Sequence, residues 1–175
     1  IIFDTTLRDG AQTEGISLSL EDKLRIAAEL DKVGIDYIEG GWPGSNPKDL
    51  AFFREARKLA LKHSRIAAFG ATRRAHSKAR SDANLAALLE SKAKTATIFG
   101  KSWDLHVTDV FHTSLKENIA MIHDSVSFLK AKKLEVIYDA EHFFDGFASH
   151  PEYALSTVEE AARAGADMVD LCDTN

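Results

Sequence analysis

The pair Arg8-Asp9 places a guanidinium beside a carboxylate at the point where the first apolar run of the chain ends. Arg-Asp-Gly is also a common turn sequence, because Asp and Gly favour turns for ordinary steric and hydrogen-bonding reasons. The preceding run Ile1–Phe3 reads as the start of a strand, and Gly10 is expected to let the backbone turn sharply after the acid. We therefore expect the pair at the carboxyl end of a strand, where α/β proteins build their active sites.

Polar side chains follow every predicted strand of the chain. The carboxyl ends of parallel strands share one face, so we expect these side chains to gather there. In strand order they are Arg8 and Asp9, then Glu39, then Arg73 and Arg74, then Lys101, then Glu141 and His142, and finally Asp173 and Thr174.

The carboxylates in this set would repel one another if they met, since unit charges about 4 Å apart cost roughly 4 kcal/mol at an effective dielectric near 20. Arg8 supplies one compensating charge, and a divalent cation would compensate better because hard cations accept carboxylate oxygens. The alternative is that Glu39 and Asp173 cap the helices that follow them. The histidines form no HxH or HExxH pattern, and only His142, beside Glu141, is a candidate ligand or acid–base group.

Six short β-like runs alternate with amphipathic or Ala-rich segments, and their first residues are 30 to 39 positions apart. The runs are 1–5, 35–39, 65–69, 95–99, 134–139 and 167–172. Ser19 with Asp22 and Ser114 with Glu117 predict capping boxes, and Asn46-Pro47 predicts a capped helix start. Strand–helix repetition of this kind indicates a parallel sheet covered by helices.

Two architectures fit this repeat. A (βα)8 barrel takes about 250 residues, or roughly 31 per unit, so residues 1–175 would be a partial catalytic barrel domain of about five and a half units. It would hold six parallel strands and five helices, truncated before strands seven and eight and any carboxy-terminal domain. An open doubly wound sheet needs no missing residues, but the chain has no GxGxxG or GxxxxGK[ST] phosphate loop.

Composition favours a small-molecule ligand. The chain has 175 residues, 45% of them hydrophobic, and a net charge of -5 that argues against nucleic acid or an anionic membrane as the main partner. The lone Cys172 is expected to be a packed strand residue in a reducing compartment. No apolar run approaches the roughly 20 residues that span a bilayer, and no signal peptide is recognised, so we expect a cytoplasmic protein.

The segment Asp4–Gln12 resembles the opening strand of the DRE-TIM metallolyase superfamily, which includes isopropylmalate, citramalate and homocitrate synthases and the hydroxymethylglutaryl-CoA lyases. Tyr37–Pro43 resembles the second strand of that superfamily and Asp170–Asn175 its sixth. The segments Thr97–Thr108 and Tyr138–Gly146 look most like bacterial and archaeal (R)-citramalate synthases. The resemblance covers essentially the whole chain and implies the TIM (βα)8 barrel rather than the open sheet.

The resemblance also implies roles for residues that match the family pattern. Asp9 would be a metal ligand, and Arg8 would be the catalytic cation facing the reacting carbonyl. Glu39 would be the second-strand acid that supports the Arg8-Asp9 pair, and Glu141 would be the fifth-strand acid at the substrate site; both are expected to be catalytic residues. Thr174, with Gln12 assisting, would help to bind a 2-oxo acid.

The implied activity is an acyl transfer that condenses acetyl-CoA with pyruvate to give (R)-citramalate and CoA, in isoleucine and branched-chain amino-acid biosynthesis. A divalent metal (Mg2+, Mn2+ or Zn2+) is the implied cofactor, and the parent enzyme would be a homodimer. The family completes its metal site with an HxH pair on strand seven, so the fragment alone is expected to be inactive. The alternatives are an isopropylmalate or homocitrate synthase that uses another 2-oxo acid, or a non-catalytic barrel fragment that acts as an association module.

Overall fold

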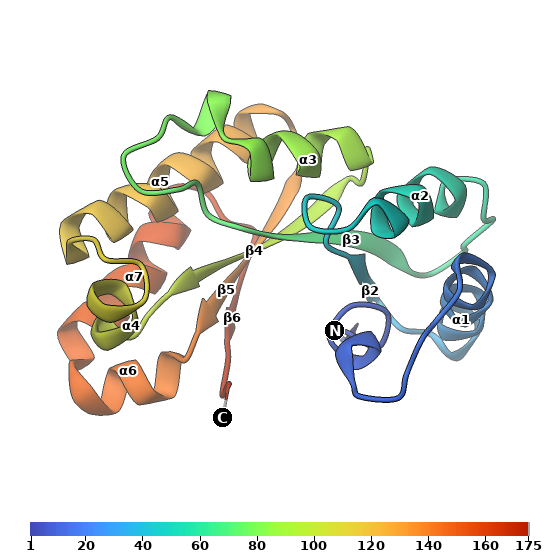
Figure 1. The fold of residues 1–175 in the computed structure, drawn as a ribbon, viewed down its shortest axis with the longest axis horizontal. Coiled ribbons are helices and arrows are strands. Elements are labelled where there is room, and N and C mark those ends of the chain that lie inside the picture. Colours follow the sequence, from blue (N-terminus) through green and yellow to red (C-terminus); the bar gives the residue numbers. More distant parts are fainter. Residues whose placement is uncertain (175) are drawn as a thin grey trace. The chain divides into compact units, whose positions relative to one another are not determined.

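The computed structural model describes residues 1–174 and consists of strands that alternate with helices (Figure 1). The strands are β1 (Phe3–Asp4), β2 (Tyr37–Gly41), β3 (Arg65–Ala71), β4 (Thr95–Lys101), β5 (Glu135–Glu141) and β6 (Met168–Leu171). The helices are α1 (Leu20–Val33), α2 (Pro47–Ala56), α3 (Ala83–Ser91), α4 (Asp104–Asp109), α5 (Leu115–Ala131), α6 (Phe143–Ser149) and α7 (Pro151–Arg163). Short 3-10 helices occupy Gly10–Gln12 and Ala79–Ser81.

The order of the strands decides between the two architectures. Hydrogen bonding links the strands in the order β1-β2-β3-β4-β5-β6, which is also their order in the chain. The pairs β1–β2, β2–β3 and β5–β6 are parallel. A doubly wound nucleotide-binding sheet has a strand order that reverses, such as 3-2-1-4-5-6, whereas successive βα units of a barrel pair in sequence. The barrel-type fold is therefore confirmed and the open sheet is excluded.

The sequence predicts five helices, whereas residues 1–174 form seven α-helices. The two additional helices, α4 and α6, are six and seven residues long and follow β4 and β5 almost at once. Neither begins with a side-chain cap, so neither carries the usual sequence signal of a helix start. In α6, Gly146 packs against the carbonyl of Ser102, where a Cβ would collide with backbone atoms.

The predicted helix starts are borne out in most details. Ser19 and Asp22 form a complete capping box, and the Asn46 side chain accepts a hydrogen bond from the amide of Lys48 at the start of α2. Ser114 accepts from the amide of Glu117, but the Glu117 carboxylate binds elsewhere, so only half of that box is made.

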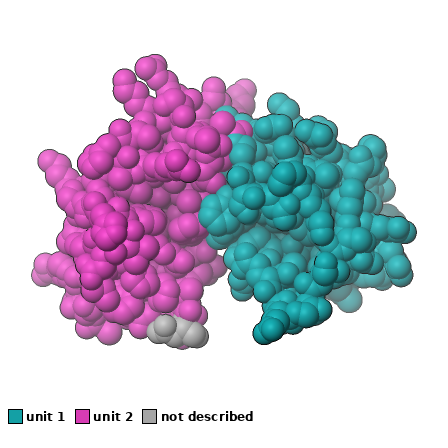
Figure 2. Space-filling model, viewed as in Figure 1, with its two compact units in different colours: residues 1–70, 87–96 teal, residues 71–86, 97–175 magenta. Residues whose placement is uncertain are grey.

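The chain divides into two compact units (Figure 2). Unit 1 consists of residues 1–70 and 87–96, and its core includes the fully buried Leu7, Ile38 and Phe52. Unit 2 consists of residues 71–86 and 97–175, and its core includes the fully buried Val126 and Tyr138. Over residues 1–174, no helix combines the length and apolar character needed to cross a bilayer.

Asp31 on α1 ties down the loop that precedes β3. Its carboxylate accepts hydrogen bonds from the backbone amides of Ser64, Lys62 and His63, which lower the pKa of Asp31 from 3.8 to about 2. Because the folded-state pKa lies below the unfolded one, this stabilisation is present above about pH 4 and is lost as the pH falls toward 2.

We predict that Asp31→Ala lowers the urea midpoint of unfolding at pH 7 and that its difference from the unsubstituted protein shrinks between pH 4 and pH 2. The matched control is Glu29→Ala, which removes an exposed acid on the same helix that forms a surface ion pair with Lys32. A difference that does not change with pH would contradict the proposed role of the Asp31 carboxylate.

Candidate active site

The residues after β1 form a tight turn that places Arg8. The Asp4 carboxylate accepts hydrogen bonds from the amide and hydroxyl of Thr6, and the Thr5 carbonyl accepts from the amides of Arg8 and Gly10. The expectation that Gly10 provides special backbone freedom is wrong. Its φ lies outside the left-handed region, and an added Cβ would make only ordinary contacts, because the turn is closed by hydrogen bonds instead.

Arg8 forms an ion pair with Glu39, which lies in the middle of β2 (Tyr37–Gly41) and not at its end as the sequence predicted. The Arg8 Nε lies 2.5 Å from Glu39 Oε2, and the two side chains are 17% and 1% exposed. The guanidinium carbon of Arg8 lies 3.8 Å from the ring centroid of Phe69 on β3. Trp42 packs edge-on against the same Phe69 ring, at a centroid distance of 5.5 Å. One cation is therefore oriented by a carboxylate on one side and an aromatic face on another.

Glu39 does not cap the helix that follows it, since Asn46 takes that role. The register between β2 and β3 shifts between Glu39 and Gly41, which is an irregularity of the kind that redirects side chains next to functional sites. Burying a carboxylate is costly unless a partner compensates its charge, and Arg8 provides that partner.

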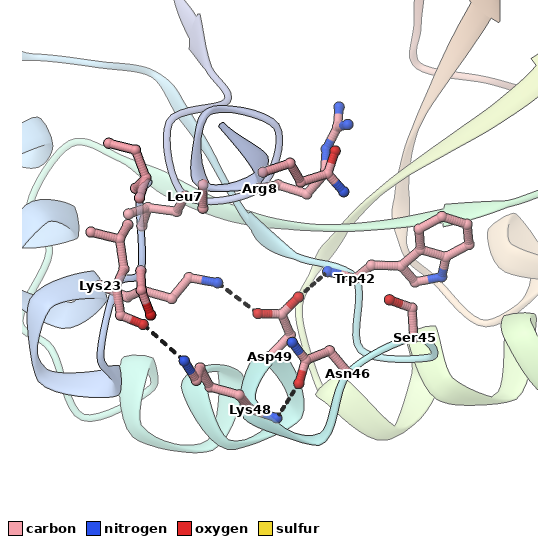
Figure 3. A pocket seen from close by; sticks show the side chains of 13 residues that line it. Leu7, Arg8, Lys23, Trp42, Ser45, Asn46, Lys48 and Asp49 are labelled. Atoms are coloured by element: carbon pink, nitrogen blue, oxygen red, sulfur yellow. Dashed lines mark hydrogen bonds and ion pairs between the residues drawn. The ribbon is translucent and has the colours of Figure 1, made fainter. Parts of the chain in front are cut away.

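Asp9 directly precedes the short 3-10 helix Gly10–Gln12, and Gln12 is the last residue of that helix. Asp9 accepts a hydrogen bond from Arg8 Nη1 at 3.2 Å, and its side chain is 64% exposed. Gln12 lines the same pocket as Arg8, a cavity of about 200 Å³ (Figure 3). Asp9 is thus available to solvent, whereas Arg8 is largely enclosed.

A buried ion pair forms one wall of this pocket. Lys23 on α1 donates to Asp49 on α2 at 2.7 Å, and the other Asp49 oxygen accepts from the Trp42 amide at 2.8 Å (Figure 3). Gly41 has φ +143, and a side chain there would collide with the Asp49 carboxylate. Asp49 therefore fixes the backbone directly after β2. Sequence reasoning missed this pair because 26 positions separate its members.

A second cluster lies in unit 2, at the ends of β4 and β5. Lys101 and Glu141 form an ion pair, with side chains that are mostly buried. The Lys101 ammonium also lies 5.5 Å from the ring centroids of Phe99 and Phe111. The sequence predicted that positive groups would accompany the carboxylates, and Lys101 takes that place for Glu141.

His142 follows Glu141 in a left-handed conformation with φ +53, which is uncommon for a residue with a side chain. Its amide donates to Thr174 Oγ1 at 2.9 Å, and its Nδ1 lies 3.0 Å from Asp145 Oδ2. The His106 ring stands edge-on to the His142 ring, with 4.5 Å between the ring centroids. The Trp103 ring lies against both imidazole rings. Burial, followed by the charges of His142 and Lys101, lowers the pKa of His106.

Cys172 and Asp173 directly follow β6. Cys172 is half-buried beyond β6, and burial, followed by the charges of Asp139 and Asp170, raises the pKa of its thiol. This fits the expected packed cysteine rather than a nucleophile. Asp173 is exposed.

The residues of this chain do not by themselves fit a divalent metal ion. In residues 1–174, no three or more His, Cys, Asp or Glu side chains come together in a way that could hold one. Asp9 offers a single exposed carboxylate, and hard divalent cations take about six or more ligands.

Comparison with known proteins decides the family. The sequence profile of the HMGL-like family matches residues 1–175. The chain belongs to the HMGL-like family. The predicted membership of the DRE-TIM metallolyase superfamily is thereby confirmed.

Proteins similar to the chain include (R)-citramalate synthases and 2-isopropylmalate synthases. Several (R)-citramalate synthases are 54–57% identical to the chain. That of Aquifex aeolicus is 57% identical over 174 residues, which is 99% of this chain and 33% of that protein. The 2-isopropylmalate synthase of Synechococcus sp. WH7803 is 34% identical over 99% of this chain and 31% of that protein. The chain thus spans about one third of the length of these relatives.

A solved structure supports the fold. Hydroxymethylglutaryl-CoA lyase from Pseudomonas aeruginosa superposes with a TM-score of 0.74 at 21% identity, covering 98% of this chain and 57% of that one. At this identity the likeness concerns the fold alone, and it agrees with the barrel-type strand order.

We predict that Arg8→Met destabilises the protein by about 3 kcal/mol, because it leaves the buried Glu39 carboxylate without its cation. The double variant Arg8→Met/Glu39→Leu should be more stable than Arg8→Met alone, since it removes both charges. Urea denaturation of the two variants measures the difference. Arg25→Met, at an exposed arginine of α1, is the control and should change stability little.

Proposed function

We propose that the protein carrying this chain condenses acetyl-CoA with pyruvate to give (R)-citramalate and CoA. The observation that carries the proposal is the contrast in identity. (R)-citramalate synthases match at 54–57% over nearly the whole chain, whereas 2-isopropylmalate synthase matches at 34%. The contrast favours pyruvate over a larger acceptor within a family of related condensations.

Arg8 has the surroundings that an oxyanion-stabilising group needs. In the condensation, a base removes a methyl proton from acetyl-CoA, and the resulting carbon forms a bond to the keto carbon of pyruvate. The keto oxygen then becomes an alkoxide, whose negative charge a fixed cation stabilises. Arg8 is held by Glu39 and Phe69, so its charge is oriented before the reaction begins.

Glu141 is our candidate for proton transfer, because it ends β5 and is only partly enclosed. The Lys101 ammonium lies beside this carboxylate and compensates its charge, and a carboxylate can accept a proton from a substrate. Water then hydrolyses the thioester, so that the acyl carbon gains an oxygen and CoA leaves as the thiol. That Glu141 and the Arg8 cluster act at one site stays a prediction from the sequence.

The 2-oxo acid would be held by groups that donate hydrogen bonds. Gln12 lines the pocket beside Arg8, and Thr174 carries a hydroxyl next to the His142 amide. We propose Asp9 as one ligand of a divalent metal (Mg2+, Mn2+ or Zn2+), which would need further ligands besides those that residues 1–174 bring together.

The alternative acceptors are 2-oxoisovalerate, as in 2-isopropylmalate synthase, and 2-oxoglutarate, as in homocitrate synthase. A different alternative is a non-catalytic fragment that associates with another chain through its outermost strands. For the parent enzyme we propose a cytoplasmic homodimer. The chain has a single cysteine and hence no internal disulfide, which is consistent with a reducing compartment.

We predict that the full-length protein carrying this chain releases CoA from acetyl-CoA faster with pyruvate than with 2-oxoisovalerate or 2-oxoglutarate. Thiol release, followed by identification of the product acid, measures this. A preference for either larger acid overturns the assignment of pyruvate. The 175-residue chain alone should show no turnover, and condensation by it would overturn our expectation that it is inactive.

We further predict that Arg8→Lys and Glu141→Gln each lower kcat/KM at least a hundredfold in the full-length protein. Lysine lacks the planar fork that Glu39 and Phe69 orient, and glutamine cannot accept the methyl proton. The control is Glu152→Gln, an exposed acid in the first turn of α7, which should retain activity. Full activity of Glu141→Gln would remove Glu141 from the proposed mechanism.

A further inference from the structure

The loop between β3 and α3, residues 72–82, is rich in cations in a chain whose net charge is negative. We call it the basic loop. Arg74, His76, Lys78 and Arg80 are exposed, and in the described chain the side chains of Arg74, Lys78 and Arg80 form no ion pair. Three cations without carboxylate partners, within seven consecutive residues, form a site that attracts anions.

The basic loop is anchored by a buried arginine. The Arg73 side chain is 5% exposed and donates to Asp124 and Glu117 of α5 at 2.8 and 2.7 Å. Burial alone would lower the pKa of Arg73, but these carboxylates raise it above its ordinary value. Its amide donates to Ser125 at 2.8 Å. The loop therefore lies fixed along α5 (Figure 1).

The other acids near the basic loop are already occupied by its backbone. Asp82 accepts from the Arg74 amide and from the first amides of α3, and Glu117 also accepts from the His76 amide. His76 has φ +59, a conformation held in place by that contact. The local carboxylates thus face inward and fix the main chain. They leave the outer cations free to meet an anionic ligand.

We propose that the basic loop binds the phosphate groups of CoA. This inference rests on the proposed use of acetyl-CoA. The loop follows the carboxyl end of a strand, which is the end where parallel βα folds bind ligands. CoA carries a diphosphate and a 3′-phosphate at the end remote from its thioester, so it needs several separated cations rather than one. Two of the three cations are arginines, which bind phosphate oxygens through paired hydrogen bonds.

The test compares two variants that remove the same charge. The loop variant Arg74→Gln/Lys78→Gln/Arg80→Gln removes the three unpaired cations of the basic loop. The matched control Lys62→Gln/Lys94→Gln/Lys132→Gln removes three exposed lysines that precede β3, β4 and β5, at the opposite ends of the strands. Calorimetric titration of the full-length protein with CoA at low salt should show about tenfold weaker binding for the loop variant and an unchanged Kd for the control.

Pantetheine, which has the thiol arm of CoA but no nucleotide phosphates, separates a phosphate site from a general defect. Its binding should be the same in both variants. Equal weakening of CoA binding in both variants would mean that overall charge is responsible, and unchanged binding in the loop variant would exclude the loop as a site. Weaker pantetheine binding in the loop variant would indicate a structural defect. Each of these results overturns the proposal.

The proposal and the proposed reaction can fail separately. If the protein binds CoA through the basic loop yet forms no citramalate from pyruvate, only the reaction is wrong. If condensation proceeds and the KM for acetyl-CoA is the same in the loop variant, only the loop assignment is wrong. In the expected outcome the loop variant has a raised KM for acetyl-CoA and an unchanged kcat.

Discussion

The buried carboxylate of Glu39 is the constraint on which unit 1 depends. A charge with 1% exposure persists inside a protein only beside a compensating cation, and Arg8 meets that requirement at 2.5 Å. The position of the arginine in turn requires the hydrogen-bonded turn after β1 and the ring of Phe69 beneath the guanidinium. The same contacts that stabilise the pair also fix the orientation of the Arg8 guanidinium, which lines the pocket.

The ion pairs Arg8–Glu39 and Lys101–Glu141 both compensate a partly or fully buried carboxylate, but they expose different partners. In unit 1 the acid is buried and the cation faces the pocket, so the pair presents positive charge. In unit 2, Lys101 is the less exposed member of its pair, at 11% against 24% for Glu141, so the acid is the more accessible partner. These opposite arrangements are consistent with the roles proposed above, in which Arg8 stabilises negative charge and Glu141 transfers a proton.

Much of the fold could be predicted from the sequence because its signals are local. The strand–helix period and the caps at Ser19 and Asn46 depend on residues a few positions apart. The same local signals placed Arg8 shortly after the first strand, but Glu39, predicted at the end of the second strand, lies within β2. The partnership of Lys101 with Glu141 could not be foreseen, because it joins positions 40 apart. The helices α4 and α6 escaped prediction because they are short and uncapped, and Gly10 was misjudged because hydrogen bonds shape its turn.

The contact between Gly146 and the Ser102 carbonyl has a consequence for how this fold can diversify. Since no Cβ separates them, the segment after β4 and helix α6 pack backbone against backbone and behave as one piece. Chimeras between related synthases should therefore exchange residues 95–149 together. A recombination point between β4 and α6 would combine the segment after β4 from one parent with α6 from the other. These two backbone surfaces would not have evolved to pack against each other.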